Sequence, residues 1–487
     1  MNTAVPGHDD DFIVGAEAFA QRYRGHAAFR LLRFYLRCSV EELETLAKFA
    51  YCACLPSNTI PIQESLARTV FGLVTMPAYY FLKKSWLWSP AAKTEFALET
   101  IDPPYFEAWF SRLYENLPGS KRLSPRSPEL FDRSDLSLPC GASVCLGDLA
   151  RLMFVAPLLA PALVALSMAV RLNLLKTCRQ AVAAYTTYRG YFRRFPCRHF
   201  ITFDDYPNHP ARRIAFRQAC DGELIAIQNG ERGHLPQLAY GCADRYFLFG
   251  PKFIEIMKGL KADVGRYEPV GALCLNQRYG LYLEETSRGV PETRYDVLFV
   301  DQGVSPHNGT PAYYTEALLR ILENLAKFHR LHPGVRLFYQ LRHYDEASRF
   351  HQEAVLAMLN GRFPGVFGVL GNDGRGESYR NILHANLTVT FESTLGFEAL
   401  MLGRKALFVN YSGNPGETMC SDERYQIEDP SADYGRFEEA VTRLLACEPG
   451  EVPAVARERH FAFDGKVQER IAAALSGSRA RAAAAVV

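Results

Sequence analysis

The sequence predicts an α/β protein with two halves that face a cleft, each built on a mostly parallel sheet, and a helix-rich region ahead of them. The chain has 487 residues, enough for two to four domains of roughly 150 residues each. From about residue 196 to 475, short apolar runs alternate with segments of helical periodicity, which is the pattern of βαβ units. The first 195 residues are rich in aromatic and long apolar stretches and lack that alternation.

Composition excludes several classes of protein. Hydrophobic residues make up 48% and charged residues 22%, so the chain is not mainly disordered. The formal net charge of +2 gives no electrostatic argument for nucleic acid as a partner. The twelve cysteines are scattered without a CxxC pair, so we expect no structural zinc site and a reducing compartment. The N-terminus has no apolar core of a secretory signal, so the expected location is cytoplasmic.

The N-terminal region, 1–195, contains an uncharged apolar stretch at 152–170. As a helix it covers about 28 Å, near the thickness of a bilayer core. Seven basic residues and no acid follow in 171–198, interleaved with aromatics, which suits an anionic cytoplasmic leaflet. Three interpretations stay open for 152–170: a buried core helix, a peripheral or re-entrant membrane contact, and a single membrane span. The basic run also fits single-stranded nucleic acid, but nothing else in the chain supports that.

The middle region, 196–290, has the pattern of the first Rossmann-like half. Its expected strands are 199–205, 223–230, 245–250 and 267–273, and its expected helices are 209–221 and 251–260. The segment GVPETR, 289–294, is the candidate linker to the next half.

The C-terminal region, 291–475, has the pattern of the second Rossmann-like half. Its expected strands are 295–303, 335–343, 366–370, 387–391 and 405–411. Its expected helices are 311–331, 346–360, 376–385, 394–402, 434–446 and 455–474. The tail 476–487 is small and unpatterned, and we expect it to be disordered.

The strongest candidate site follows the strand that ends at Phe391, because ligands of open α/β sheets bind beyond the carboxyl ends of strands, at helix N-termini. The hydroxyls of Ser393 and Thr394, with the free N–H groups of the first turn, form an anion site suited to a phosphate. Gly396 allows a ligand or a neighbouring chain segment to approach closely. Glu398 lies one turn after Thr394 and suits the hydroxyls of a ribose. For this segment alone, an ordinary Ser/Thr helix cap is the favoured interpretation.

A second candidate site follows the predicted strand at 199–205. Asp204 and Asp205 are candidates for the general base that deprotonates an acceptor hydroxyl, and an Asx turn before Pro207 explains them equally well. Arg212 and Arg213 on the next helix either bind phosphate or contact solvent.

Two weaker candidates also follow strands. The first is a set of polar and glycine residues, namely Gln228, Asn229, Gly230 and Glu231. The second is Arg342 with His343, which suits a diphosphate. The sequence contains no GxSxG, no GxxxxGK[ST], no HExxH, and no GxGxxG that opens a helix after a strand.

The run SYRNILHANLTVTFESTLGFEALMLGRKALFVNYSG, 378–413, resembles the donor-binding segment of GT-B glycosyltransferases of bacterial surface-carbohydrate and capsule synthesis, including the Kdo-transferase-like and CDP-glycerol-transferase-like groups. Upstream, ELIAIQNGERGHLPQLAY (223–240), DRYFLFGPKFIEIMK (244–258) and YEPVGAL (267–273) look like further segments of the same group. The resemblance spans about 200 to 413. The family often has His where this chain has Asn229, which leaves base chemistry to Asp204, Asp205 or Glu231.

The resemblance implies a GT-B-like fold and a metal-independent glycosyltransferase without a cofactor. Its donor would be a CMP-, CDP- or UDP-linked sugar, and its acceptor a growing surface polysaccharide or a lipid-linked glycan at the inner face of the cytoplasmic membrane. Ser393 and Thr394 would hold the phosphate, Glu398 the ribose, and Arg342 with His343 the leaving group. Segment 390–405 also resembles the nucleotide site of UDP-sugar epimerases. A nucleotide-sugar epimerase, a CDP-glycerol-type polyol-phosphate transferase and a non-catalytic envelope-assembly scaffold are therefore the alternatives.

Overall fold

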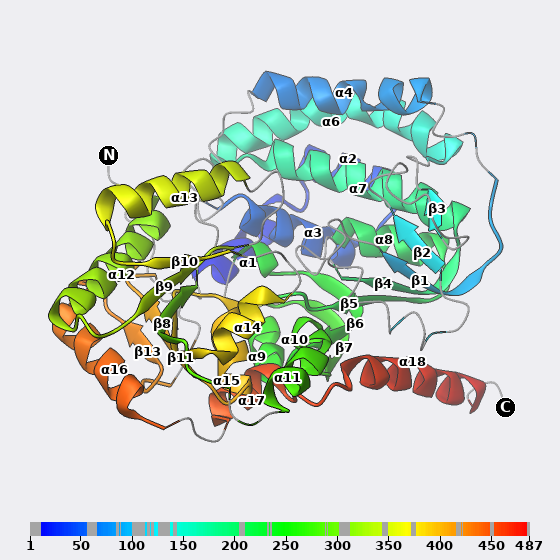
Figure 1. Ribbon diagram of the computed structural model, residues 1–487. Helices are drawn as coiled ribbons and strands as arrows, with labels where there is room; N and C mark the ends of the chain where they lie inside the picture. Colours follow the sequence, from blue (N-terminus) through cyan, green and yellow to red (C-terminus); the bar gives the residue numbers. More distant parts are fainter. Residues whose placement is uncertain are drawn as a thin grey trace. The chain divides into compact units, whose positions relative to one another are not determined.

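The computed structural model contains two compact units, each with its own parallel sheet (Figure 1). Unit 1 comprises 1–229, 234–248 and 254–268, and unit 2 comprises 230–233, 249–253 and 269–487. The structure describes residues 11–55, 66–83, 87, 89–99, 113, 117, 121–124, 137–139, 144–203, 210–230, 233, 236–287, 289, 291–300, 312–342, 349–371, 376–414, 420, 422–448 and 452–484.

The sheet of unit 1 has the strand order β3-β2-β1-β4-β5-β6-β7. Its strands are β1 (Thr94–Glu99), β2 (Lys121–Ser124), β3 (Ser137–Pro139), β4 (Cys197–Thr202), β5 (Glu223–Ile227), β6 (Cys242–Leu248) and β7 (Asp263–Pro269). The pairs from β3 through β6 are parallel. The order reverses direction between β1 and β4, as in a doubly wound Rossmann-like sheet.

Helices surround this first sheet and build a separate layer beyond it (Figure 1). They are α1 (Asp11–Tyr23), α2 (Ala27–Leu36), α3 (Val40–Ala53), α4 (Leu66–Leu82), α6 (Leu146–Val170), α7 (Leu174–Arg194), α8 (Pro210–Ala219) and most of α9 (Lys252–Gly259), with the short 3-10 turn η1 (Pro236–Leu238). The start of α3 is specified locally, because Ser39 and Glu42 form a capping box. Helix α7 joins the layers by packing against both α6 and α8.

The sheet of unit 2 has the order β10-β9-β8-β11-β12-β13, and all of its pairs are parallel. Its strands are β8 (Tyr295–Val300), β9 (Leu337–Gln340), β10 (Gly368–Leu370), β11 (Ala385–Thr390), β12 (Lys405–Asn410) and β13 (Gln426–Glu428). Its helices are α10 (Leu273–Gln277), α11 (Tyr279–Thr286), α12 (Ala312–Leu331), α13 (Arg349–Arg362), α14 (Glu377–Leu383), α15 (Thr394–Met401), α16 (Tyr434–Ala446), α17 (Ala454–His460) and α18 (Val467–Ala484). This order is also Rossmann-like.

The predicted fold class, α/β with two Rossmann-like sheets and added N-terminal helices, is therefore confirmed. The boundary predicted at residue 195 differs from the structure, because β1, β2 and β3 extend the first sheet into the N-terminal region. The helix predicted at 455–474 is two helices, α17 and α18. The tail predicted as disordered from 476 instead continues α18 through Ala484.

Candidate functional site

The strand order of each sheet locates where a ligand site is expected. In a doubly wound sheet, ligands bind outside the carboxyl ends of the strands at which the order reverses. That position falls between β8 and β11 in unit 2, and between β1 and β4 in unit 1. In unit 2 it lies beside the start of α15, where the sequence placed its strongest candidate.

Ser393 is the N-cap of α15. Its backbone N–H donates to Thr390 Oγ1 at 3.1 Å, and its own hydroxyl accepts from the Leu395 N–H at 3.3 Å. Ser393 and Thr394 are half-buried, and Thr390 is buried at the end of β11. The hydroxyl of Ser393 keeps its proton for donation to an anion while it accepts from the helix. The capping geometry is thus confirmed, and it is compatible with a phosphate at the same helix end.

Glu392 lies between β11 and this cap. The Tyr314 hydroxyl donates to Glu392 Oε1 at 2.7 Å, and the Tyr314 ring packs on Phe391 at 4.7 Å between centroids. These contacts join α12 to the end of β11. The turn that precedes the candidate phosphate position is therefore fixed by side chains from two elements.

Gly396 serves the packing of α15 on the sheet. A Cβ added there would lie 2.5 Å from Phe408 Cζ and 3.0 Å from Thr390 Cγ2. The sequence allowed two explanations for Gly396, close approach of a ligand or of a neighbouring chain segment. The structure shows the second. Glycine lets the first turn of α15 lie directly against β11 and β12.

Glu398 is buried, with 2% of its surface exposed. Cys274 Sγ donates to Glu398 Oε1 at 3.4 Å, and the Tyr379 hydroxyl hydrogen-bonds to the same carboxylate. Burial, together with the charge of Glu398, raises the pKa of both Cys274 and Tyr379 well above their usual values. Both groups therefore stay protonated at neutral pH and act as donors to the Glu398 carboxylate.

Of the two other predicted residues in this part of the chain, Arg342 is among the described residues. Arg342 follows β9 and is exposed, and its carbonyl accepts from Gln352 Nε2 at 3.5 Å. His343 lies outside the described residues. The neighbouring Gln340 is buried, and its Oε1 accepts from Asn381 Nδ2 at 2.6 Å, which fixes the carboxyl end of β9.

In unit 1, the structure reveals a buried polar cluster at the carboxyl ends of β1 and β4. Glu99 Oε2 accepts from Arg212 Nη1 at 2.8 Å and from the Thr202 hydroxyl. Glu99 Oε1 accepts from the Tyr188 hydroxyl at 2.8 Å. Arg212 also lies over the Tyr188 ring, 5.0 Å from its centroid. The sequence analysis had Arg212 facing a ligand or solvent, whereas it is buried against Glu99.

The sequence analysis missed Glu99 because it did not recognise TEFALE, 94–99, as a strand. The available signal was a short continuous apolar run, 96–98, that ends in a carboxylate. Asp204, Asp205 and Glu231 lie outside the described residues, so their role as a base stays a prediction.

Three further predicted residues, at 228–230, follow β5, and the last of them begins a short segment that belongs to unit 2. Gln228 is fully buried, and its N–H donates to the Phe247 carbonyl at 2.9 Å. Asn229 Nδ2 donates to the Phe203 carbonyl at 2.9 Å, which ties this turn to the end of β4. Gly230, which follows directly, is half-buried. Asn229 thus lies beside the reversal point of the first sheet.

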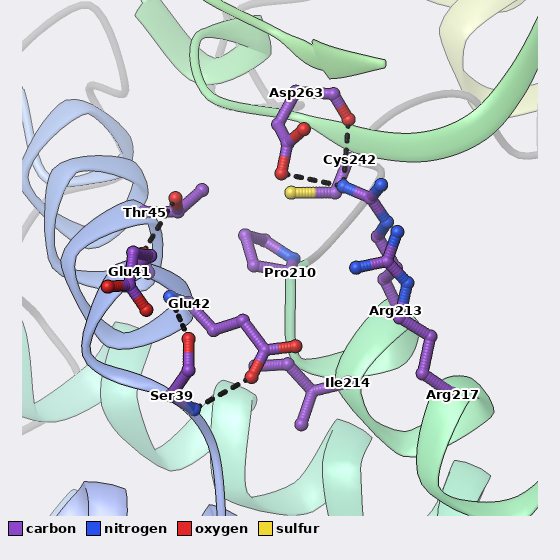
Figure 2. A pocket seen from close by; sticks show the side chains of 10 residues that line it. All are labelled: Ser39, Glu41, Glu42, Thr45, Pro210, Arg213, Ile214, Arg217, Cys242 and Asp263. Atoms are coloured by element: carbon purple, nitrogen blue, oxygen red, sulfur yellow. Dashed lines mark hydrogen bonds and ion pairs between the residues drawn. The ribbon is translucent and has the colours of Figure 1, made fainter. Parts of the chain in front are cut away.

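A pocket of about 380 Å³ in unit 1 lies elsewhere (Figure 2). Cys242 and Asp263 line it. They are the first residues of β6 and β7, so the pocket lies at the amino ends of these strands, away from the carboxyl ends where a ligand is expected. Arg213 in its wall contacts both Asp263, at 2.6 Å, and Asp244, at 3.1 Å. Because acids of the protein already neutralise this guanidinium, the pocket is a weak anion site.

Within the described ranges, no three His, Cys, Asp or Glu side chains gather as a metal site. The described cysteines are free thiols, and most of them are buried. Helix α6 is long and apolar enough to cross a membrane, a test that a core helix of a soluble protein also passes.

No protein-family model matches the chain, and no curated protein matches it. Among solved structures, UDP-GlcNAc 2-epimerase from Methanocaldococcus jannaschii, in complex with UDP-GlcNAc and UDP, is 10% identical, with 79% of this chain and 99% of that chain covered and a TM-score of 0.46. UDP-N-acetylglucosamine 2-epimerase from Rickettsia bellii is 8% identical, with 79% and 96% covered and a TM-score of 0.47. The wall teichoic acid polymerase TagF is 11% identical, with 85% and 98% covered and a TM-score of 0.42. These values are too low to transfer an activity, and the strand order of each sheet gives the fold class independently.

Proposed function

We propose that this protein is a metal-independent glycosyltransferase that moves a sugar from a nucleotide-sugar donor to a growing surface polysaccharide or a lipid-linked acceptor. The observation that carries the proposal is the position of the Ser393–Thr394 pair. It caps a helix that begins directly after β11, at the reversal point of a Rossmann-like sheet. The resemblance of segment 378–413 to a donor-binding segment supports the same assignment.

In this proposal, the N-terminus of α15 binds the phosphate that leaves with the nucleotide. The Ser393 and Thr394 hydroxyls and the free N–H groups of the first turn stabilise its developing negative charge. Arg342 and His343 add positive charge from the end of β9. This stabilisation needs no metal ion.

The reaction requires a base for the acceptor hydroxyl, and the candidates are Asp204, Asp205 and Glu231. The acceptor oxygen forms a bond to the anomeric carbon, the bond from that carbon to the phosphate oxygen breaks, and the carboxylate takes the hydroxyl proton. Asn229 replaces the histidine that the resemblance leads one to expect, so it contributes an amide and no proton transfer. We place the acceptor at the inner face of the cytoplasmic membrane.

Three other functions are compatible with the same fold. A nucleotide-sugar epimerase is supported by the likeness of 390–405 to the nucleotide site of that class, and a CDP-glycerol-type polyol-phosphate transferase by the likeness of 378–413 to that group. A non-catalytic envelope-assembly scaffold would need no base. The acceptor separates three classes: either transferase releases nucleotide only when an acceptor is present, an epimerase converts the donor without one, and a scaffold does neither. The donor separates the two transferases, because one uses a nucleotide-sugar and the other CDP-glycerol.

The binding test is a thermal-shift screen with CMP, CDP, UDP, GDP and their sugars. A ligand present at about 100 times its Kd stabilises the folded state by about 2.7 kcal/mol. We expect a combined Ser393→Ala and Thr394→Ala variant to lose most of the shift that the best nucleotide gives. Ser39→Ala is the matched control, because Ser39 caps α3 with a comparable hydrogen bond of 3.1 Å in unit 1. An equal nucleotide shift in both variants contradicts the site.

Glu398 is tested separately, because it is buried against Cys274 and Tyr379. If its carboxylate binds ribose, Glu398→Gln weakens binding of the nucleotide and leaves binding of inorganic pyrophosphate unchanged. If it only supports α15, both ligands lose affinity together.

A further inference from the structure

The outward faces of α4 and α6 in unit 1 are apolar. On α6, side chains at helical spacing point away from the unit and are exposed, namely Leu146, Met153, Phe154, Leu158 and Met168. Phe154 is 64% exposed and Met168 is 71% exposed. Pro157, Pro161 and Ala165 lie on the same stripe and are exposed too, so no polar side chain interrupts it.

Helix α4 carries a second stripe of the same kind. Its exposed apolar side chains are Phe71, Val74, Tyr79, Phe81 and Leu82, and no charged residue lies between 69 and 82. Helices α4 and α6 pack side by side at the outside of unit 1 (Figure 1). The two stripes are therefore neighbours, and we call them together the α4–α6 surface.

Helix α6 is attached to unit 1 along its length. Its inner stripe, which includes Leu152, Leu159 and Leu163, is fully buried. Near its start, the buried Asp148 pairs with Arg189 of α7. Spanning a bilayer would expose this ion pair and remove that packing. A helix bound on one side and apolar on the other lies on a membrane and does not cross it.

Part of the basic, aromatic run 171–198, for which the sequence favoured membrane contact, is buried. On α7, Tyr185, Tyr191 and Phe192 are buried in the core of unit 1, and Arg189 is buried with Asp148. This part of the run is internal structure. The exposed apolar side chains lie on α6, which contains the predicted segment 152–170, and on α4, which the sequence did not indicate.

The described charges of the helices that form or flank the α4–α6 surface are mostly positive. Exposed or half-buried cations lie on α2 and α6 and directly after α4 and α6, namely Arg30, Arg33, Lys83, Arg151 and Arg171. Arg151 lies over the ring of the exposed Phe34, 5.3 Å from its centroid. Among the described side chains of α2, α4 and α6, the one acid is Asp148, which is buried and ion-paired.

We propose that the α4–α6 surface docks onto an anionic lipid bilayer, with both helices parallel to the membrane plane. Apolar and aromatic side chains enter the boundary between headgroups and acyl chains, and the surrounding cations contact lipid phosphates. A second copy of the chain fits less well. A two-fold dimer through this surface sets the same patch of both copies together, so cations meet cations, and the described side chains of α2, α4 and α6 offer no accessible acid to pair them. The inference does not depend on the reaction proposed above.

The test uses the full chain in vesicle flotation, with phosphatidylcholine alone and with phosphatidylglycerol added. We expect binding that needs the anionic lipid and weakens as salt rises. Phe71→Ser with Phe154→Ser should reduce partitioning at least roughly tenfold, since each ring buries about 150–250 Å² when it is covered. Lys83→Gln with Arg171→Gln should reduce partitioning into anionic vesicles roughly fivefold for each cation.

The matched control is Leu283→Ser with Leu331→Ser, two exposed apolar residues of unit 2 that should leave partitioning unchanged. All variants should melt within a few degrees of the wild type, because the substituted side chains lie at the surface. Failure of the wild type to float with anionic vesicles overturns the proposal, as does equal binding by the control and the Phe71/Phe154 variant. A lipid-free dimer that the Phe71/Phe154 variant abolishes overturns it too and assigns the surface to a second copy.

Discussion

Glu99 and Arg212 form a buried ion pair at the reversal point of the first sheet, and we expect it to be energetically coupled. Glu99→Gln leaves the Arg212 guanidinium buried without its counter-ion and should cost about 3–5 kcal/mol of unfolding free energy. Arg212→Met should cost a similar amount. The double variant should lose clearly less than the sum, because replacing both charges removes the unpaired one. Urea unfolding of the four proteins measures the coupling, and additive losses would show that the pair is not coupled.

Gly396 tests how tightly α15 is held against the sheet. Gly396→Ala places a Cβ within 2.5 Å of the Phe408 ring and should destabilise the protein by about 1–3 kcal/mol. The control is Gly361→Ala on the exposed side of α13, where nothing lies within 4 Å. That change should stabilise by about 0.4–1 kcal/mol, because alanine loses less chain entropy on folding than glycine. Thermal unfolding compares the two, and equal effects would mean that α15 can shift to make room.

At the candidate site, the residues that could be predicted are those fixed by their immediate neighbours. The cap by Ser393 depends on Thr390 and Leu395, which lie within three residues of it. The surroundings of Glu398 depend on Cys274, 124 residues away in sequence, so no local pattern indicates them. The pairing of Glu99 with Arg212 spans 113 residues and was missed for the same reason.

Among the secondary-structure elements, length and burial decided what could be predicted. Strands β11 and β12 have six residues each and are almost fully buried. β12, KALFVN, contains the continuous apolar run ALFV, and β11, ANLTVT, alternates apolar residues with Asn and Thr, so both patterns indicate strands. Strands β2 and β3 have four and three residues, KRLS and SLP, and no apolar period. They exist as strands because β1 pairs with β2 and β2 with β3, and such pairing across the chain has no signature in short polar segments.

The docking of α18 depends on one residue of α10. Asn276 Oδ1 accepts from the N–H of Val467, the first residue of α18, at 3.0 Å, and Asn276 Nδ2 donates to Gln468 Oε1 at 2.6 Å. Asn276→Ala removes hydrogen bonds from two buried partners and should cost about 2–6 kcal/mol, at about 1–3 kcal/mol for each group. Amide hydrogen exchange in 467–475 should accelerate.

The control for that change is Asn173→Ala, which removes the cap of α7, a hydrogen bond of 3.3 Å to the Lys176 N–H. It should cost about 1 kcal/mol and leave exchange in α18 unchanged. If Asn276→Ala also leaves that exchange unchanged, α18 is held by its apolar contacts alone.

At the scale of the whole molecule, the two units share one pattern of strand order, but different helices surround each sheet. Each sheet reverses its order once, and each has buried polar residues at that point, Thr390 in unit 2 and Glu99 with Thr202 in unit 1. The sequence predicted most of both sheets, from β4 to β12, because βαβ alternation is a long-range pattern that many residues share, and it did not predict β1, β2, β3 or β13. The outer surface of α4 depends on which residues the fold leaves uncovered, so composition could not reveal it.

The buried thiols should make the folded protein sensitive to alkaline pH. Burial raises the pKa of Cys38, Cys52 and Cys242 to about 12, from an ordinary value near 9. A raised folded-state pKa means that this stability is complete below about pH 9 and is lost as pH rises toward 12, because the unfolded chain releases these protons first. Each thiol contributes a loss of up to about 1.4 kcal/mol per pH unit in that window.

Urea unfolding at pH 7, 8.5 and 10 should show stability nearly constant over the first step and falling over the second. Cys52→Ala removes one titrating group and should reduce the slope of this decline by up to about 1.4 kcal/mol per pH unit. A free energy of unfolding that stays constant to pH 10 in the wild type would mean that the folded state lets these thiols ionise.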